Sequence, residues 1–151
     1  MPTQPLEKLR DARYAQLRSF RRDGTPVDTP IWFAIDANAV LFRTKIGPKS
    51  KRLTVRPDVE LTACDYRGQL HSGAATMVGR ATILPGAAAE AANRILHERY
   101  GWQWNIVPMI NVPGVTYVHQ DLSAREKLRR ARTRAVWPDS VIVRVEPAEA
   151  L

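Results

Sequence analysis

Short apolar runs separated by tight-turn signals restrict the fold of this chain more than any other feature. Residues 14–20 are predicted to form a strand, and Asp23-Gly24 just after them is the strongest local signal for a hairpin turn. A second run, residues 25–35, ends at Asp36-Ala37-Asn38, which turns the chain into a third run, residues 39–44. Three strands joined by two tight turns predict an antiparallel meander.

Two prolines restrict the second of these strands. Pro26 and Pro30 have no backbone N–H and cannot donate a hydrogen bond to a central ladder. The first half of that run is therefore predicted to be an edge strand or a bulged strand.

Beyond the meander, the sequence predicts further strands and a few helices. The strands are expected at residues 59–65, 75–84 and 140–146, with residues 115–119 as a further candidate. The helices are expected before Tyr14 (from Leu6 and Leu9), after Pro48 (ended by Pro57), from Pro85-Gly86 to Gly101, and from the Ser123/Glu126 capping box to about Arg134. Six or seven short antiparallel strands with a few helices predict a mainly β (α+β) fold, a small antiparallel β-barrel with peripheral helices.

The composition favours a folded protein outside the membrane. The 151 residues are predicted to form one domain, 1–151, and a hydrophobic content of 44% argues against disorder. No run of about 18 apolar residues is present, and the charged N-terminus lacks the apolar stretch of a secretory signal. The single Cys64 cannot form an internal disulfide, and with the other features it predicts a cytoplasmic protein.

The net charge of +8 suits an anionic partner: nucleic acid, an acidic membrane surface or an anionic cofactor. The predicted helix at residues 123–135 holds six cationic side chains: Arg125, Lys127, Arg129, Arg130, Arg132 and Arg134. These residues could bind nucleic acid or an acidic chain. The preferred interpretation is a solvated surface helix with its Ala and Leu face packed on the barrel.

A second group of cations follows the third strand directly. Gly47-Pro48 leads into Lys49, Ser50, Lys51 and Arg52. A solvated turn would carry such residues, but so would a phosphate site at a helix N-terminus, where backbone N–H groups and the helix dipole also favour an anion. Each charge-assisted hydrogen bond would contribute on the order of 1.5–3 kcal/mol, so two or three could set most of the affinity for a phosphate-bearing ligand.

Several segments, taken in order, resemble a known family. Arg22-Asp23-Gly24, Pro26 and Pro30-Ile31-Trp32-Phe33 follow a pattern of the pyridoxamine-phosphate-oxidase-like split β-barrel oxidoreductases, in particular those that use the deazaflavin coenzyme F420 (flavin/deazaflavin oxidoreductases, B group). Thr44, the segment from Lys49 to Arg52, Pro57-Asp58-Val59 and residues 78–84 continue the family order. The resemblance covers roughly residues 14–100 and the last strand. Gly47-Pro48 departs from the family's usual lead-in, and residues 102–137 share no pattern with it.

The resemblance implies a split antiparallel β-barrel of the FMN-binding type. It also implies a homodimer with cofactor sites at the interface and a small-molecule substrate. Lys49, Ser50, Lys51 and Arg52 would bind the cofactor phosphate. Thr44 and Arg43 would lie beside the phosphate or the ribityl chain. The flat ring would lie along Pro30, Ile31 and Trp32, with Phe33 in the core.

Two classes of function follow from these expectations. The first is an F420-dependent oxidoreductase that passes a hydride to or from an electron-poor organic substrate. An FMN-dependent enzyme of the pyridoxamine-phosphate-oxidase type is the closest alternative, because the FMN phosphate suits the same loop. The second class is a non-catalytic protein that binds the cofactor or nucleic acid, of which nucleic acid is the less favoured ligand.

The sequence identifies no catalytic side chain and no metal site. The three histidines, His71, His97 and His119, do not pair with other ligands at metal-binding spacing. His97 lies in a polar helix and is expected to be exposed, and Cys64 is expected to be an inert core thiol. Where a cofactor carries the chemistry, the lack of an acid–base set does not exclude an enzyme.

Overall fold

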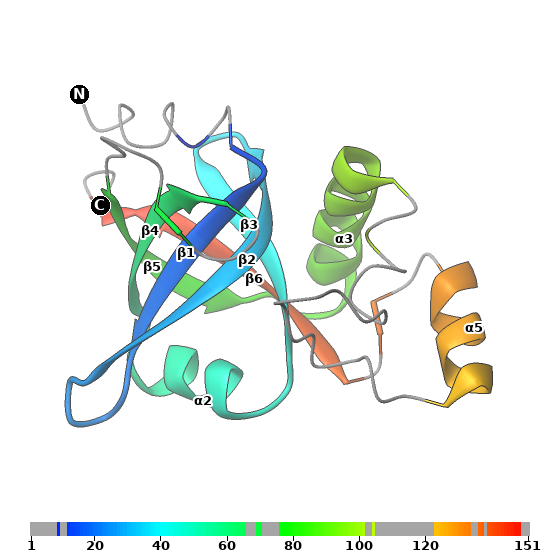
Figure 1. Ribbon diagram of the computed structural model, residues 1–151, viewed down its shortest axis with the longest axis horizontal. Coiled ribbons are helices and arrows are strands. Elements are labelled where there is room, and N and C mark those ends of the chain that lie inside the picture. The colour runs from blue at the N-terminus through cyan, green and yellow to red at the C-terminus, as the bar shows by residue number, and fades with distance from the viewer. Residues whose placement is uncertain are drawn as a thin grey trace.

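The structure, a computed structural model, describes residues 9, 12–65, 69–70, 76–101, 104, 123–133, 136–137 and 139–148. Six antiparallel strands close into a barrel in the order β1-β2-β3-β6-β5-β4 (Figure 1). Their bounds are Tyr14–Phe20 (β1), Pro26–Asp36 (β2), Ala39–Lys45 (β3), Asp58–Cys64 (β4), Thr76–Ile83 (β5) and Ser140–Pro147 (β6). The mainly β barrel predicted from the sequence is confirmed.

The predicted meander forms β1, β2 and β3, and its register explains the prolines. β2 pairs with β1 from Pro26 to Trp32, but it pairs with β3 only from Phe33 to Asp36. The half of β2 that holds both prolines therefore has a strand on one side only, as expected for an edge. Before Phe33 on β2 and after Phe42 on β3 the two strands separate, and the unpaired region between them is called the split below.

Two apolar clusters stabilise the fold, one on each face of this part of the sheet. Strand side chains alternate between faces, so Ile31, Phe33 and Phe42 fill the barrel interior. Ala34 and Leu41 point outward, where they pack with residues of the next helix, among them Leu96. The expectation that Phe33 belongs to the core is confirmed.

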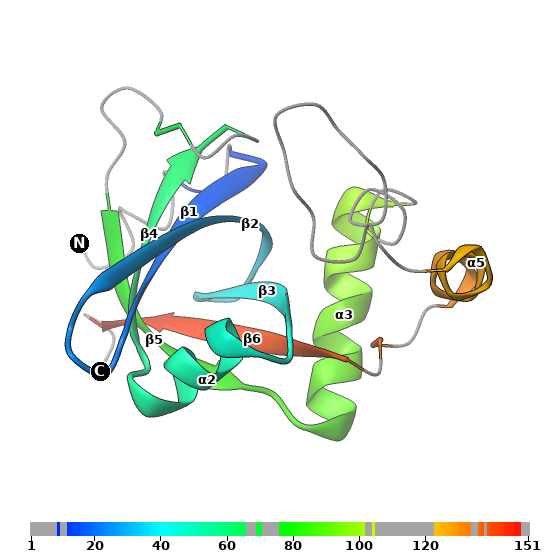
Figure 2. The same ribbon diagram turned by 60° about the horizontal axis from the view of Figure 1, so that its bottom comes forward.

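Three helices accompany the barrel in the described part of the chain. α2 (Pro48–Val55) lies across one end of the barrel, and α3 (Gly86–Tyr100) covers the outer face of β2, β3 and β6. α5 (Ala124–Arg132) lies on the side of α3 away from the barrel (Figures 1 and 2). Gly101, at φ 62°, ends α3, and the Ser123 hydroxyl caps α5 by accepting the N–H of Glu126 at 3.2 Å. Both ends match the sequence prediction.

Two expectations about exposure are wrong. His97 is half-buried, with its Nδ1 shielded from water. The Leu face of α5 does not pack on the barrel: Leu128 is 53% exposed, and the residue that α5 buries is Arg130. An ion-paired guanidinium replaces the apolar contact that helical spacing predicts. Cys64 is buried, as expected.

Some predicted elements lie outside the described residues. Of the helix expected before Tyr14, the structure describes Leu9, which is helical and buried. The candidate strand at 115–119 is not described. Of the helices in the described part, none has the length and hydropathy that a membrane span requires.

Candidate functional site

The start of α2 is built by a local network around Ser50. The Ser50 hydroxyl accepts the N–H of Gly47 and donates to the Gly47 carbonyl, both at 3.0 Å. Pro48 occupies the first helical position, where its missing N–H costs nothing. The Ser50 hydroxyl, predicted to bind phosphate, is thus used to form the turn. The first-turn amides of Lys49 and Ser50 have no intrahelical acceptor and stay available to a ligand.

Three cations surround this helix start. Lys49 is half-buried, Lys51 is exposed, and Arg52 is half-buried, with its Nε donating to the Ser19 hydroxyl at 3.2 Å. Within the part of the chain that the structure describes, none of the three forms an ion pair with a carboxylate. The cluster is therefore uncompensated positive charge.

The cost of burying a cation beside other cations is seen in the lowered pKa of Lys49. Burial, together with the positive charge of Arg52, lowers the pKa of its amine to about 8. The pKa of Arg52 is also lowered, by burial and by Arg21. A bound anion would offset both effects, because it interacts favourably with the charged forms.

α2 runs from the end of β3 to the hairpin between β1 and β2. Its N-terminus follows β3 by two residues, while Arg56 at its C-terminus lies 3.5 Å from the carbonyls of Arg21 and Arg22. The helix thus lies at the end of the barrel toward which the split opens (Figure 1). The cations at its start stand beside the end of β3.

The backbone of β2 at the split is unpaired. The Phe33 N–H donates to the Tyr100 hydroxyl at 2.9 Å, and that hydroxyl lies 2.7 Å from the carbonyls of Phe33 and Arg13. Phe33 therefore directs its backbone groups toward β1, and because these groups alternate along a strand, those of Trp32 and Pro30 face the split. Among the described residues, no strand pairs with that edge.

The predicted site residues lie in three places: the barrel interior, the outer part of the sheet and helix α2. Ile31 is buried inside the barrel, and by alternation Thr44 points the same way. Pro30 is exposed, while Trp32 and Arg43 lie on the outer face beside α3. Lys49, Ser50, Lys51 and Arg52 lie on α2. The structure thus places the backbone of 30–32 and Arg43 on the two strands that border the split, with α2 beginning two residues after β3 ends, whereas the Ile31 side chain belongs to the core.

An aromatic cluster surrounds Trp32 on the outer face. Its ring centroid lies 4.6 Å from that of Tyr100, 6.0 Å from that of Tyr14 and 6.3 Å from that of Trp104. The indole N–H of Trp104 donates to the buried Asn93 side chain at 2.9 Å. The cluster fixes Trp32, whose half-buried indole forms an apolar wall beside the split.

Arg43 is held by two residues that the sequence does not single out. Its guanidinium carbon lies 3.9 Å from the Trp104 ring centroid and 4.1 Å from that of Trp137, and its side chain donates to the Trp104 carbonyl. Burial lowers the pKa of Arg43 to about 9, with the Arg130 charge adding to the decrease and Asp139 opposing it. Trp104 and Trp137 belong to no recognisable motif, so no pattern in the sequence predicts their cation–π contacts with Arg43.

Comparison with known proteins assigns the family. The model of the family described as pyridoxamine 5′-phosphate oxidase matches residues 2–150. This chain belongs to that family. No curated protein matches the chain.

Solved structures of proteins with different described functions share the fold. The heme storage protein HutZ from Vibrio cholerae matches with a TM-score of 0.61 at 14% identity, covering 97% of this chain and 91% of that one. An FMN-binding protein from Nostoc punctiforme related to pyridoxamine 5′-phosphate oxidase matches with a TM-score of 0.59 at 15% identity, over 97% and 76% of the two chains. An F420 reductase matches with a TM-score of 0.51 at 22% identity, over 94% and 92%. At such identities the likeness shows the fold alone.

Proposed function

We propose that this protein is an oxidoreductase that binds the deazaflavin coenzyme F420, with FMN as the alternative cofactor, and passes a hydride between it and an electron-poor organic substrate. The observation that carries the proposal is the uncompensated cation cluster at the start of α2, next to the unpaired edge of β2. Membership of the family and the FMN-binding and F420-reductase neighbours support it.

The phosphate of either cofactor suits the start of α2. Lys49 and Lys51 supply ammonium groups, Arg52 retains N–H donors beyond the Nε that binds Ser19, and the first-turn amides add two more donors. A ring in the split would meet the carbonyl of Pro30 and the N–H and carbonyl of Trp32. This edge offers both donor and acceptor groups to a planar heterocycle.

The short separation along the chain between the split and the start of α2 agrees with a ligand that joins a ring to a phosphate. Arg43, beside the split, precedes Gly47 by four residues, which extend over no more than about 13 Å at 3.3 Å per residue. A bound flavin or deazaflavin supplies the two-electron chemistry. The residues of this chain hold the phosphate, orient the ring against Trp32 and exclude water from one of its faces. We include in the proposal a homodimer that completes the site and a cytoplasmic location.

The experiment compares FMN with riboflavin, which differ by the phosphate alone, and compares both with F420. Binding of FMN, riboflavin and F420 to the purified protein is followed by fluorescence, for the wild type, Lys49→Gln and the control Arg132→Gln. Arg132 is an exposed cation on α5, so its removal changes the net charge equally. We expect Lys49→Gln to weaken binding of the phosphate-bearing ligand about 10- to 100-fold, and to leave riboflavin binding and the control unchanged.

The outcomes separate the proposed functions. Binding of F420 but not FMN establishes the deazaflavin, and the reverse result establishes the flavin. A ligand that binds without turnover of any electron-poor acceptor supports a cofactor carrier instead. If neither ligand binds, or if riboflavin binds as tightly as FMN, the cations at α2 are a solvated surface and the proposal fails. DNA binding would instead weaken steeply with salt and depend on α5.

A further inference from the structure

Arg43 is a half-buried cation, and among the described residues its guanidinium edge donates to the Trp104 carbonyl alone. Trp104 and Trp137 cover its guanidinium by cation–π contacts, which engage the faces of the group. One N–H donates to the Trp104 carbonyl, while a guanidinium has five N–H groups in its plane. In the described part of the chain, no carboxylate pairs with Arg43. The remaining donors belong to a residue of β3 that directly follows Phe42, the last residue of β3 paired with β2.

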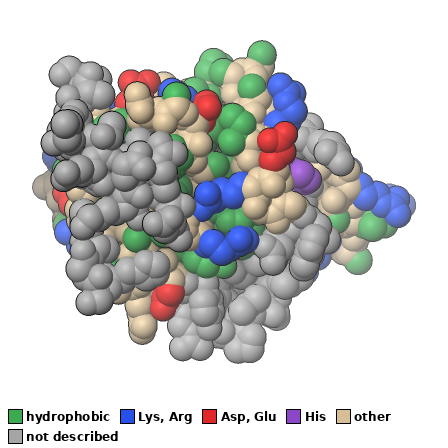
Figure 3. Space-filling model, turned by 90° about the horizontal axis from the view of Figure 1, so that it is seen from above, with side chains coloured by type: hydrophobic (Ala, Val, Ile, Leu, Met, Phe, Trp, Pro, Cys, Tyr) green, Lys and Arg blue, Asp and Glu red, His purple; other side chains and the backbone are tan. Residues whose placement is uncertain are grey.

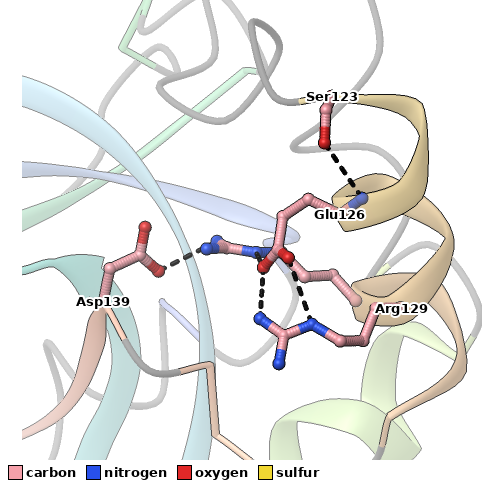
Figure 4. A network of polar contacts seen from close by, with 5 residues as sticks. Ser123, Glu126, Arg129 and Asp139 are labelled. Atoms are coloured by element: carbon pink, nitrogen blue, oxygen red, sulfur yellow. Dashed lines mark hydrogen bonds and ion pairs between the residues drawn. The ribbon is translucent and has the colours of Figure 1, made fainter.

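Trp137 also contacts a second arginine. The guanidinium carbon of Arg130 lies 5.0 Å from the Trp137 ring centroid. Arg130 is 6% exposed and donates at 2.9 Å both to Asp139, just before β6, and to Glu126, one turn earlier on α5 (Figure 4). The contacts therefore follow the order Arg130, Trp137, Arg43, Trp104, and they connect α5 to β3.

Among the described residues, α5 buries no apolar side chain. Arg130 is the one residue that α5 buries in the structure, and Leu128 points to solvent. Figure 3 shows Lys and Arg side chains at the end of the molecule where α5 lies in Figure 1. Because a guanidinium in a fixed fork matches two carboxylates and stacks on an indole, Arg130 is suited to orient Trp137.

We infer that Arg130 is a positioning residue for the cofactor site: it orders Trp137, which holds Arg43 so that the edge of the Arg43 guanidinium donates to an oxygen of the ligand in the split. This inference rests on the proposed function for the identity of the ligand, but the coupling of Arg130 to Arg43 exists without any ligand. A purely structural Arg130 would stabilise α5 and leave Arg43 unchanged.

The test begins with the ligand-free protein. The Nε–H signal of Arg43 in ¹⁵N-labelled protein is assigned by its loss in Arg43→Lys, and the ring currents of two indoles displace it from ordinary arginine positions. We expect the signal to move in Arg130→Gln, to return part of the way in Arg130→Lys, and to stay in place in Arg129→Gln. Arg129 binds the same Glu126 but is 62% exposed and touches neither indole, so it is the matched control.

The second measurement is the affinity for whichever of FMN or F420 binds the wild type. We expect Arg130→Gln and Arg43→Lys to weaken it about tenfold each, with the double variant no weaker than either, because the two residues act through one contact. Thermal unfolding of each variant identifies any that fails to fold, and Arg130→Lys then replaces Arg130→Gln.

Each failure has a separate meaning. An unchanged Arg43 signal in a folded Arg130→Gln variant overturns the positioning role. A displaced signal with unchanged affinity overturns the claim that Arg43 contacts the ligand. Absence of FMN and F420 binding in the wild type overturns the proposed function, and the Arg43 signal still decides whether Arg130 positions Arg43.

Discussion

Replacing Tyr100 by Phe tests how α3 is fixed to the barrel. The Tyr100 hydroxyl, on a side chain that is 4% exposed, accepts the Phe33 N–H at 2.9 Å and lies 2.7 Å from the carbonyls of Phe33 and Arg13. It extends the ladder between β1 and β2 beyond the last paired residues, Tyr14 and Trp32. Tyr100→Phe removes this oxygen and leaves the ring in contact with Trp32 and stacked on Trp104.

The magnitude follows from the groups left without partners. The buried Phe33 N–H loses its acceptor, which costs roughly 1–3 kcal/mol, and the carbonyls lose a shared donor, at about 0.5–1.5 kcal/mol net. The gain from no longer burying a phenol hydroxyl offsets part of this sum. We expect a loss of about 2–3 kcal/mol in the free energy of unfolding, or roughly 5–10 °C in melting temperature for a chain of this size.

Urea denaturation followed by circular dichroism measures the loss, with Tyr14→Phe as the control. Tyr14 lies in the same aromatic cluster, 6.0 Å from Trp32, and its hydroxyl has no hydrogen bond in the structure. We expect the control to change the free energy of unfolding by less than about 0.5 kcal/mol. Equal losses in the two variants, or no loss in Tyr100→Phe, would refute the reasoning that the hydroxyl completes the ladder.

Three further predictions concern other parts of the chain. The affinity for FMN or F420 should fall as the pH rises from about 7 through the Lys49 pKa of about 8, because the neutral amine no longer attracts phosphate; calorimetric titration that shows no such fall contradicts this role. Gly79→Ala should destabilise the barrel by about 2–3 kcal/mol, since a Cβ would meet the Glu146 carbonyl at 2.6 Å, whereas Gly47→Ala meets nothing and should be neutral in thermal unfolding. Cys64, whose pKa burial raises to about 11, should react with a thiol reagent near neutral pH only as fast as the protein unfolds, and rapid labelling of the native protein would contradict its burial.

The local elements could be predicted because their signals are contiguous. Asp23-Gly24, the prolines of β2 and the Ser123/Glu126 cap each act within a few residues, so the turns, the edge and the helix ends follow from backbone chemistry. The cation cluster at α2 was equally visible, since its members are consecutive. Their binding of phosphate stays a prediction.

The residues that meet across the chain could not be predicted. Arg43 contacts Trp104 and Trp137 because β3 pairs with β6 and α3 covers both strands. Helical spacing placed Leu128 inward, but the burial of Arg130 between Glu126, Asp139 and an indole decided the orientation of α5. The spacing of apolar residues describes a single helix and cannot predict a partner such as Asp139, which lies outside that helix.

The amino-acid sequence by itself determined the strands, the turns and the position of the positive charge, because these depend on neighbours along the chain. The tertiary structure alone decided that β2 pairs with β3 only from Phe33 onward and that two indoles enclose Arg43. Both features depend on pairing and packing between segments that are far apart in the sequence, and local sequence patterns do not predict such contacts.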